Sequence, residues 1–273
     1  MAARRPTTPA RSPGRSAPSR GAPTPAREVA LDVLLAVTDR DAYANLLLPA
    51  LLAERGLHGR DAALATELAY GTLRGRGSYD AVLAACSTRA LADIDPPLLD
   101  VLRLGTHQLL ATRIGPHAAV ATSVTLARAV AGAGAAGFAN AVLRRVATQD
   151  LDSWIAAVAP DRAADPVGYL AVKTSHPGWI VAAVSESLGE EPVTGLPLTE
   201  VALAANGTRP RVTLCAVPGL ATAAELIARG SQAARWSPYG AYLDGGDPGG
   251  IPEVRQGRAA VQDEASQLAA LAL

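Results

Sequence analysis

The chain has 273 residues, of which 49% are hydrophobic and 4% aromatic, and its formal net charge at pH 7 is zero. This length allows two domains with a core each, and the abundance of Ala, Leu and Val favours helices. No apolar run approaches the roughly 18 residues that span a bilayer. Cys86 and Cys215 lie far apart, so a disulfide framework or a cysteine metal site is not indicated. We expect a cytoplasmic protein without a membrane span or a metal site.

The basic residues are concentrated at the N-terminus. Residues 1–27 contain no acidic residue, and the remaining residues therefore carry a net charge of −6. The six arginines in 1–27 are Arg4, Arg5, Arg11, Arg15, Arg20 and Arg27. A basic arm of this kind is typical of a nucleic-acid-binding tail, whereas its low complexity is equally typical of a solvated leader, and its composition resembles an organelle transit peptide. Its Pro, Ser, Thr and Ala content predicts disorder over residues 1–26.

From Arg27 the apolar residues follow a helical period for about 120 residues. Ala30, Val33, Leu34 and Val37 form the first apolar stripe. Similar patterns predict further helices over 46–52 and 61–73, after Pro96, after Pro116 and over 138–146. Because no alternating strand pattern interrupts this stretch, we predict an all-α helical bundle over 27–150.

The remaining residues predict two further parts. A linking helical segment covers 151–205, with a helix that begins near residue 178 and reaches about residue 188. Residues 211–215 and 240–243 have the character of strands, and 221–229 that of a helix, which predicts a partial α+β module over 206–273. The predicted fold class is therefore mainly α: a helical bundle followed by a partial α+β module.

A glycine-rich segment over 132–137 matches the dinucleotide-binding pattern G-x-G-x-x-G. That function requires a strand before the glycines, so that the following helix begins at the pyrophosphate. Here the preceding residues have a helical period. We interpret the segment as a turn between helices in which Gly supplies backbone freedom.

Four segments, in order, resemble the Sun/RsmB family of ribosomal RNA cytosine-C5 methyltransferases. They are TELAYGTLR at 66–74, LRLGTHQLL at 102–110, GFANAVLRR at 137–145 and QDEAS at 262–266, with a weaker match at 175–179. Members of this family join a NusB-like helical RNA-binding domain to a methyltransferase core. The resemblance implies that 27–150 is the NusB-like domain and that 206–273 belongs to the N-terminal subdomain of the core.

The family's cofactor loop, acidic cofactor contact and two working cysteines follow the Gln-Asp segment, and the chain ends before they would appear. Residues 243–250 resemble the cofactor loop, but they are one residue short and precede Gln262, so we interpret them as a surface turn. Methyl transfer in this family requires a thiolate nucleophile. Cys86 and Cys215 match no such motif and are expected to be core residues, so we predict no catalytic residue and a chain truncated before the S-adenosylmethionine-binding core.

The resemblance implies RNA contacts in the helical domain. Arg27, Arg74, Arg144 and Arg145 are the candidates, because guanidinium groups suit bidentate contact with phosphate and stacking on bases. The alternatives are complementation of helix dipoles, ordinary surface charge, and docking onto the absent core. Asn140 on its apolar helix is expected to join helices rather than to bind RNA.

The resemblance also implies that Gln262, Asp263 and Ser266 line the edge of the cofactor and base pocket in a complete enzyme. A helix cap formed by Asp263 or Ser266 is the competing explanation. S-adenosylmethionine is the implied cofactor of the complete enzyme and is not expected to bind this chain alone.

The predicted function is the RNA-recognition portion of an rRNA cytosine-C5 methyltransferase, with small-subunit ribosomal RNA as partner and the catalytic core in cis. The chain alone is expected to bind RNA without transferring methyl. One alternative is a non-enzymatic NusB-like antitermination or regulatory protein, against which residues 176–273 argue because such a protein needs no Gln-Asp segment. The other is a truncated reading frame whose product exposes apolar surface and is unstable.

Overall fold

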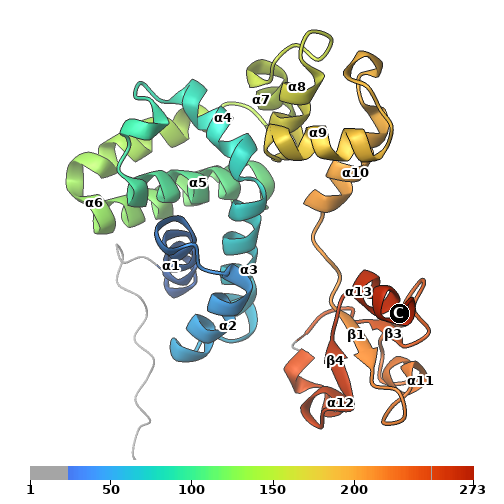
Figure 1. Cartoon of the computed structure of the whole chain (residues 1–273). Helices are drawn as coiled ribbons and strands as arrows, with labels where there is room; N and C mark the ends of the chain where they lie inside the picture. The colour runs from blue at the N-terminus through green and yellow to red at the C-terminus, as the bar shows by residue number, and fades with distance from the viewer. Residues whose placement is uncertain (1–23, 247) are drawn as a thin grey trace, which may run out of the picture. The chain divides into compact units, whose positions relative to one another are not determined.

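The computed structural model describes residues 24–246 and 248–273, and within them the chain forms two compact units (Figure 1). The first unit ends at Gly207 and the second comprises Thr208–Leu273. Most of the predicted basic arm lies outside the described residues. The described residues contain thirteen α-helices and four short strands, so the predicted fold class is confirmed.

The first three helices follow the predicted pattern. α1 (Pro25–Arg40) begins with Pro in its first turn, where the missing N–H costs nothing. α2 (Ala44–Glu54) and α3 (Gly59–Arg74) follow, and α1 packs against both. The helix begins two positions before the predicted Arg27, so Pro25 and Ala26 belong to the bundle and not to the arm.

The next three helices complete the bundle around α5 (Pro96–Ala111), which contacts α1, α3, α4 and α6. α4 (Arg76–Cys86) was not among the helices predicted by range, although Cys86 at its end is buried in the core, as expected. A short 3₁₀ turn at Leu91–Asp93 precedes α5, and α6 (Pro116–Val146) follows it.

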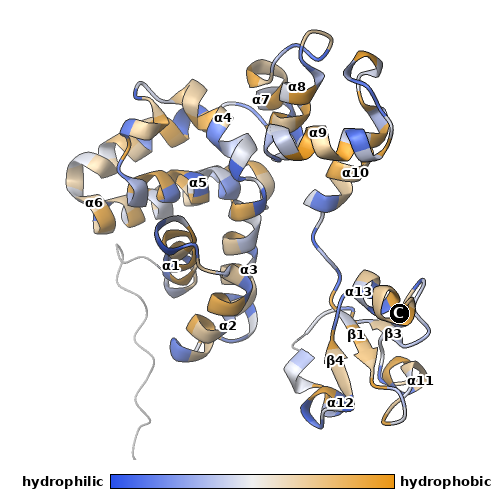
Figure 2. Ribbon diagram, viewed as in Figure 1, coloured by the Kyte–Doolittle hydropathy of each residue, from blue (hydrophilic) through white to orange (hydrophobic). Residues whose placement is uncertain are grey.

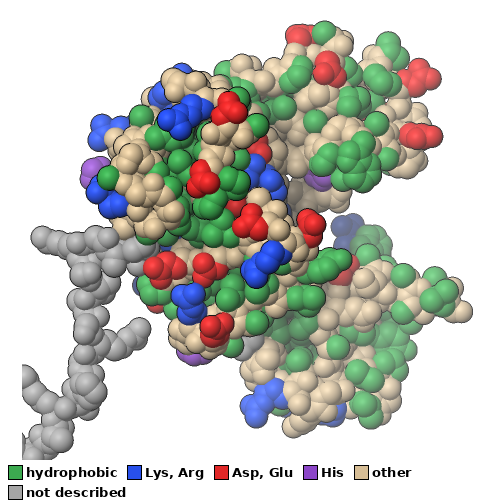
Figure 3. Space-filling view, turned by 60° about the vertical axis from the view of Figure 1, so that its left-hand side comes forward, with side chains coloured by type: hydrophobic (Ala, Val, Ile, Leu, Met, Phe, Trp, Pro, Cys, Tyr) green, Lys and Arg blue, Asp and Glu red, His purple; other side chains and the backbone are tan. Residues whose placement is uncertain are grey.

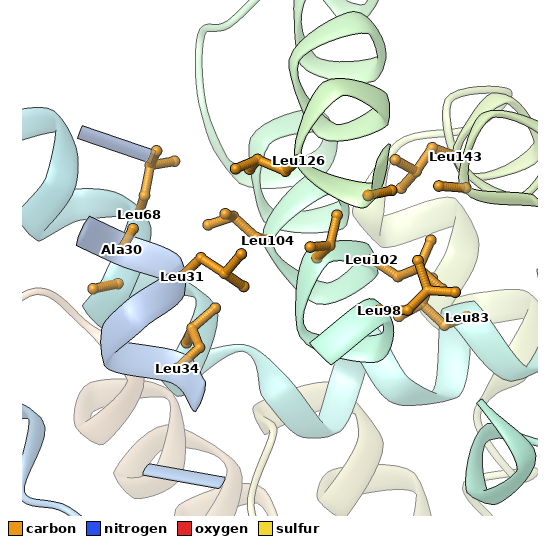
Figure 4. Packing of buried hydrophobic residues seen from close by; sticks show 14 of the residues in the cluster. Ala30, Leu31, Leu34, Leu68, Leu83, Leu98, Leu102, Leu104, Leu126 and Leu143 are labelled. Atoms are coloured by element: carbon orange, nitrogen blue, oxygen red, sulfur yellow. The ribbon is translucent and has the colours of Figure 1, made fainter. Parts of the chain in front are cut away.

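Leucine is the commonest residue in the core of the bundle, and each of the six helices contributes at least one. Leu34 of α1, Leu68 of α3, Leu83 of α4, Leu102 of α5 and Leu143 of α6 are buried and point into one shared interior (Figure 4). Hydrophobic and hydrophilic residues alternate along each helix in Figure 2, as expected for helices with one buried face.

α6 is interrupted at Gly132, whose φ of 84° and ψ of −172° are not helical. The predicted turn over 132–137 is thus confined to Gly132, and the other residues of that segment are helical. By length and composition alone, α6 is long and apolar enough to cross a membrane, and it is the one such helix among the described residues. However, the break leaves two shorter helices, 116–131 and 133–146, neither of which reaches the ~20 residues that a span requires.

The linking segment consists of four helices; the first packs into the core of the bundle through Trp154, and the other three share a small core of their own. The four helices are α7 (Leu151–Val158), α8 (Pro166–Thr174), α9 (Gly178–Ser187) and α10 (Pro197–Gly207), and a 3₁₀ turn at Pro192–Thr194 precedes α10. The buried contacts of the small core come from Leu170, Val181, Leu196 and Leu203. Contacts between α8 and α4 make this segment part of the first unit.

The second unit has a four-stranded antiparallel sheet in the order β2-β3-β1-β4. Its strands are β1 (Thr213–Ala216), β2 (Gln232–Ala233), β3 (Gly240–Tyr242) and β4 (Ala259–Val261). α11 (Ala223–Ile227), α12 (Pro252–Arg255) and α13 (Glu264–Leu271) accompany them, with a 3₁₀ turn at Pro248–Gly250. The strands predicted at 211–215 and 240–243 and the helix predicted at 221–229 are confirmed, whereas β2 and β4 were not predicted.

Candidate RNA-binding site

A pocket of about 260 Å³ lies between the two parts of α6 and the residue after its end. The lining residues are Pro116, His117, Val120 and Ala121 from the first part, and Asn140, Arg144 and Ala147 from the second. The backbone break at Gly132 explains how residues so far apart on one helix meet. Figure 3 shows basic side chains at the left-hand edge of the bundle, next to hydrophobic surface.

The pocket combines an apolar floor with three polar side chains. The imidazole of His117, the amide of Asn140 and the guanidinium of Arg144 form no hydrogen bond or ion pair with another residue in the described part of the chain. An exposed guanidinium beside an amide and an imidazole can hydrogen bond to a phosphate and an adjacent sugar. The arrangement is therefore suited to an anionic ligand with several acceptors, as RNA is.

Arg145, the neighbour of Arg144, has a structural partner. Its Nη1 donates to the carbonyl of Cys86 at 2.9 Å, and its Nη2 donates to the carbonyl of Ala85 at 3.2 Å. These carbonyls lie at the C-terminus of α4, where backbone acceptors have no partner within the helix. Arg145 thus complements the C-terminal end of a helix, which was the alternative to an RNA contact.

Arg27 lies inside the first unit and is only 8% exposed. Its Nε donates to Oε1 of Gln108 at 2.8 Å, and its Nη1 donates to the hydroxyl of Thr24 at 3.0 Å. Burial lowers the pKa of Arg27. The side chain ties the start of α1 to α5, which differs from the surface phosphate contact that we predicted.

Arg74 is half-buried at the end of α3, beside a buried polar pair. The hydroxyl of Tyr79 and Nδ1 of His107 are 2.9 Å apart, and Nε2 of His107 is 3.7 Å from Glu67. Burial, with a smaller effect of the Arg74 charge, lowers the pKa of His107 to about 4, although Glu67 opposes the shift. His107 is therefore neutral at pH 7, and Arg74 is the nearest cation to this pair that solvent can reach.

Gln262, Asp263 and Ser266 lie at the start of α13. Oδ1 of Asp263 accepts a hydrogen bond from the N–H of Ala265 at 2.9 Å, so Asp263 caps the helix, and Ser266 is exposed. Gln262 continues the sheet, because its N–H donates to the carbonyl of Thr213 at 3.0 Å. The pocket that the structure shows in the second unit is lined by other residues.

Glu264, which sequence reasoning passed over, is the buried acid of the same segment. Its carboxylate accepts hydrogen bonds from the hydroxyl of Tyr242 and from the N–H groups of Trp236 and Ser237, the last at 2.8 Å. Burial raises the pKa of Glu264, but these three hydrogen bonds outweigh it, and the pKa is lowered. An acid in the first turn of a helix was visible in the sequence, but its partners lie some 20 or more positions away.

Residues 24–148 match the model of the NusB family. The chain is 50% identical over 96% of its length to "Putative methyltransferase Rv1407" of Mycobacterium tuberculosis, of which it covers 57%. It is 32% identical over 89% of its length to the ribosomal RNA small subunit methyltransferase B of Pseudomonas putida, and covers 53% of that protein. The chain thus spans about half the length of these curated relatives.

A solved structure confirms that both units occur together in another protein. The crystal structure of PH0851 matches 91% of this chain with a TM-score of 0.64, at 15% sequence identity, and the chain covers 54% of it. At that identity the likeness concerns the fold alone.

Proposed function

We propose that this chain is the RNA-recognition portion of a small-subunit rRNA cytosine-C5 methyltransferase and that it contacts RNA through the α6 pocket. One observation carries the proposal: the pocket places Arg144 beside Asn140 and His117 in the part of the chain that matches the NusB family. The methyltransferase relatives match far beyond residue 148, into the second unit. This extent favours a methyltransferase over a free-standing antitermination protein.

The roles of the arginines follow from their surroundings. Arg144 is the principal phosphate contact, and Asn140 and His117 hydrogen bond to the adjoining sugar or phosphate. Arg74 provides a second cation at the end of α3. Arg27 and Arg145 position helices, because their donors are used inside the bundle.

The complete enzyme would act in the cytoplasm with S-adenosylmethionine as methyl donor and with its catalytic core in cis. Gln262, Asp263 and Ser266 would then border that core from the start of α13. The chain alone is proposed not to transfer methyl. Methylation of rRNA by the purified 273-residue chain would contradict this part of the proposal.

The pocket is tested by RNA binding as a function of salt concentration. Arg144→Ala is expected to weaken binding to every RNA sequence and to lower the slope of log K against log[salt] by about one, because one phosphate contact is lost. Arg128→Ala is the matched control, since Arg128 is an exposed arginine of α6 outside the pocket lining. Equal slopes for the two variants would show that the pocket does not contact phosphate.

A further inference from the structure

Aromatic and arginine side chains are interleaved on the second unit, around β3 and the turn before it. The ring of Trp236 is 63% exposed. The guanidinium of Arg235 lies 4.5 Å from the centroid of the Trp236 ring, and that of Arg211 lies 4.1 Å from the centroid of the Tyr242 ring. We call these four residues the Trp236 surface.

Glu264 holds this surface in place. Its carboxylate accepts the N–H groups of Trp236 and Ser237 and the hydroxyl of Tyr242. The same hydroxyl accepts the N–H of Arg235 at 3.2 Å. The backbone on both sides of the indole is therefore fixed by a buried carboxylate, while the indole itself remains in solvent.

The two guanidinium groups of this surface have different acidic neighbours, and the charge of Arg235 helps to lower the pKa of Glu264. Nη2 of Arg211 is 3.4 Å from Oδ1 of Asp244 and 3.0 Å from Oε1 of Gln232, so its charge is partly balanced. Arg235 forms no ion pair with any described residue, and Glu264 is engaged by its three donors. One guanidinium group thus lies over the Trp236 ring and the other over the Tyr242 ring.

We propose that the Trp236 surface binds single-stranded RNA, with one unpaired base stacked on the Trp236 ring and the flanking phosphates contacted by Arg235 and Arg211. Every base has a π-face, so an exposed, immobilised indole accepts any unpaired base, and guanidinium groups complement the phosphates on either side. Trp, Tyr and Arg are also common in protein interfaces, so the test below includes docking of a protein as an outcome.

This surface rests on the proposed function only in taking RNA as the ligand. It differs from the α6 pocket in the part of the RNA that it contacts. Stacking on the ring requires an unpaired base, whereas a phosphate contact does not. The two sites therefore predict different responses to the same pair of RNAs. An unpaired oligonucleotide should use both surfaces, and a duplex only the pocket.

The test measures binding of the whole chain to a fluorescein-labelled unpaired oligoribonucleotide and to a duplex of the same sequence. Trp236→Ala is expected to weaken binding of the unpaired RNA about 5- to 100-fold, which corresponds to the loss of one stacked base, and to leave duplex binding unchanged. Trp236→Phe should retain most of the affinity, because a ring remains. Trp179→Ala is the matched control, since Trp179 is 73% exposed and forms no cation–π contact among the described residues.

Each outcome separates this inference from the proposed function. If Arg144→Ala weakens binding while Trp236→Ala matches Trp179→Ala on both RNAs, the inference is overturned and the proposed function stands. If the whole chain binds neither RNA, both are overturned. If Trp236→Ala leaves binding of the unpaired RNA unchanged but prevents association with a separately supplied methyltransferase core, the surface docks protein and the inference is again overturned.

Discussion

Gly71 allows α3 to approach the ring of His107. A Cβ at this position would lie 2.3 Å from two atoms of the imidazole, which is far inside van der Waals contact. We expect Gly71→Ala to lower the free energy of unfolding by about 1–3 kcal/mol through overpacking. Gly134→Ala is the control, because a Cβ there meets no atom within 4 Å and the helical position favours Ala. Urea unfolding that shows equal stability for the two variants would contradict the close contact.

The buried imidazole of His107 predicts a pH dependence of stability. Burial lowers its pKa from 6.5 to about 4, so below pH 6.5 the unfolded chain binds a proton that the folded chain does not. The contribution to stability is complete above pH 6.5 and is lost as the pH falls toward 4, to a total of about 3 kcal/mol at most. His107→Gln should reduce the stability difference between pH 7 and pH 4.5. An unchanged difference would show that His107 is not the titrating group.

At the level of elements, Ser175 connects the end of α8 to the start of α4 in the bundle. It has a φ of 60°, and its Oγ accepts the N–H groups of Gly77 at 2.7 Å and Ser78 at 3.2 Å. These donors lie in the first turn of α4, where no intrahelical acceptor is available.

We therefore expect Ser175→Ala to lower the free energy of unfolding by about 1 kcal/mol, as the loss of a helix cap does. Ser187→Ala is the control, because the hydroxyl of Ser187 donates only to the carbonyl of Val184 within its own turn. Chemical denaturation followed by circular dichroism measures both. Equal midpoints would show that the contact between α8 and α4 adds nothing to the bundle.

The period of the apolar residues predicted those helices that are determined by their own stretch of sequence. The stripe that includes Val33 and Leu34 and the prolines at 96 and 116 are sufficient to place α1, α5 and α6. β2 and β4 escaped prediction because two- and three-residue strands show no alternation, and only their pairing with β3 and β1 defines them. α4 was not predicted by range, although α3 ends at Arg74 and α4 begins at Arg76, with Gly75 as the single residue between them.

The candidate site was harder to predict, because its parts depend on tertiary contacts. The sequence identified GFANAVLRR as important, but it could not show that Arg145 caps α4 while Arg144 lines a pocket. Nor could it show that Arg27 reaches Gln108, some 80 positions away. In the same way, the role of Glu264 is apparent only from the structure, which shows that its carboxylate accepts hydrogen bonds from Trp236, Ser237 and Tyr242.

At the scale of the whole molecule, the chain carries two units with separate cores and spans about half of its methyltransferase relatives. We propose that the chain recognises RNA mainly through phosphate contacts of the first unit. Such binding must weaken steeply with salt, since each neutralised phosphate releases counterions. It must also favour the RNA of the small subunit if the chain directs a methyltransferase there.

The most direct measurement is the affinity of the whole chain for a small-subunit rRNA helix fragment and for an unrelated RNA of equal length, at about 50 and 200 mM salt. We predict tighter binding of the rRNA fragment at both concentrations, with a strong loss of affinity at the higher one. Equal affinity for the two RNAs would contradict a preference for small-subunit rRNA, and an affinity that does not change with salt would contradict binding through phosphate contacts.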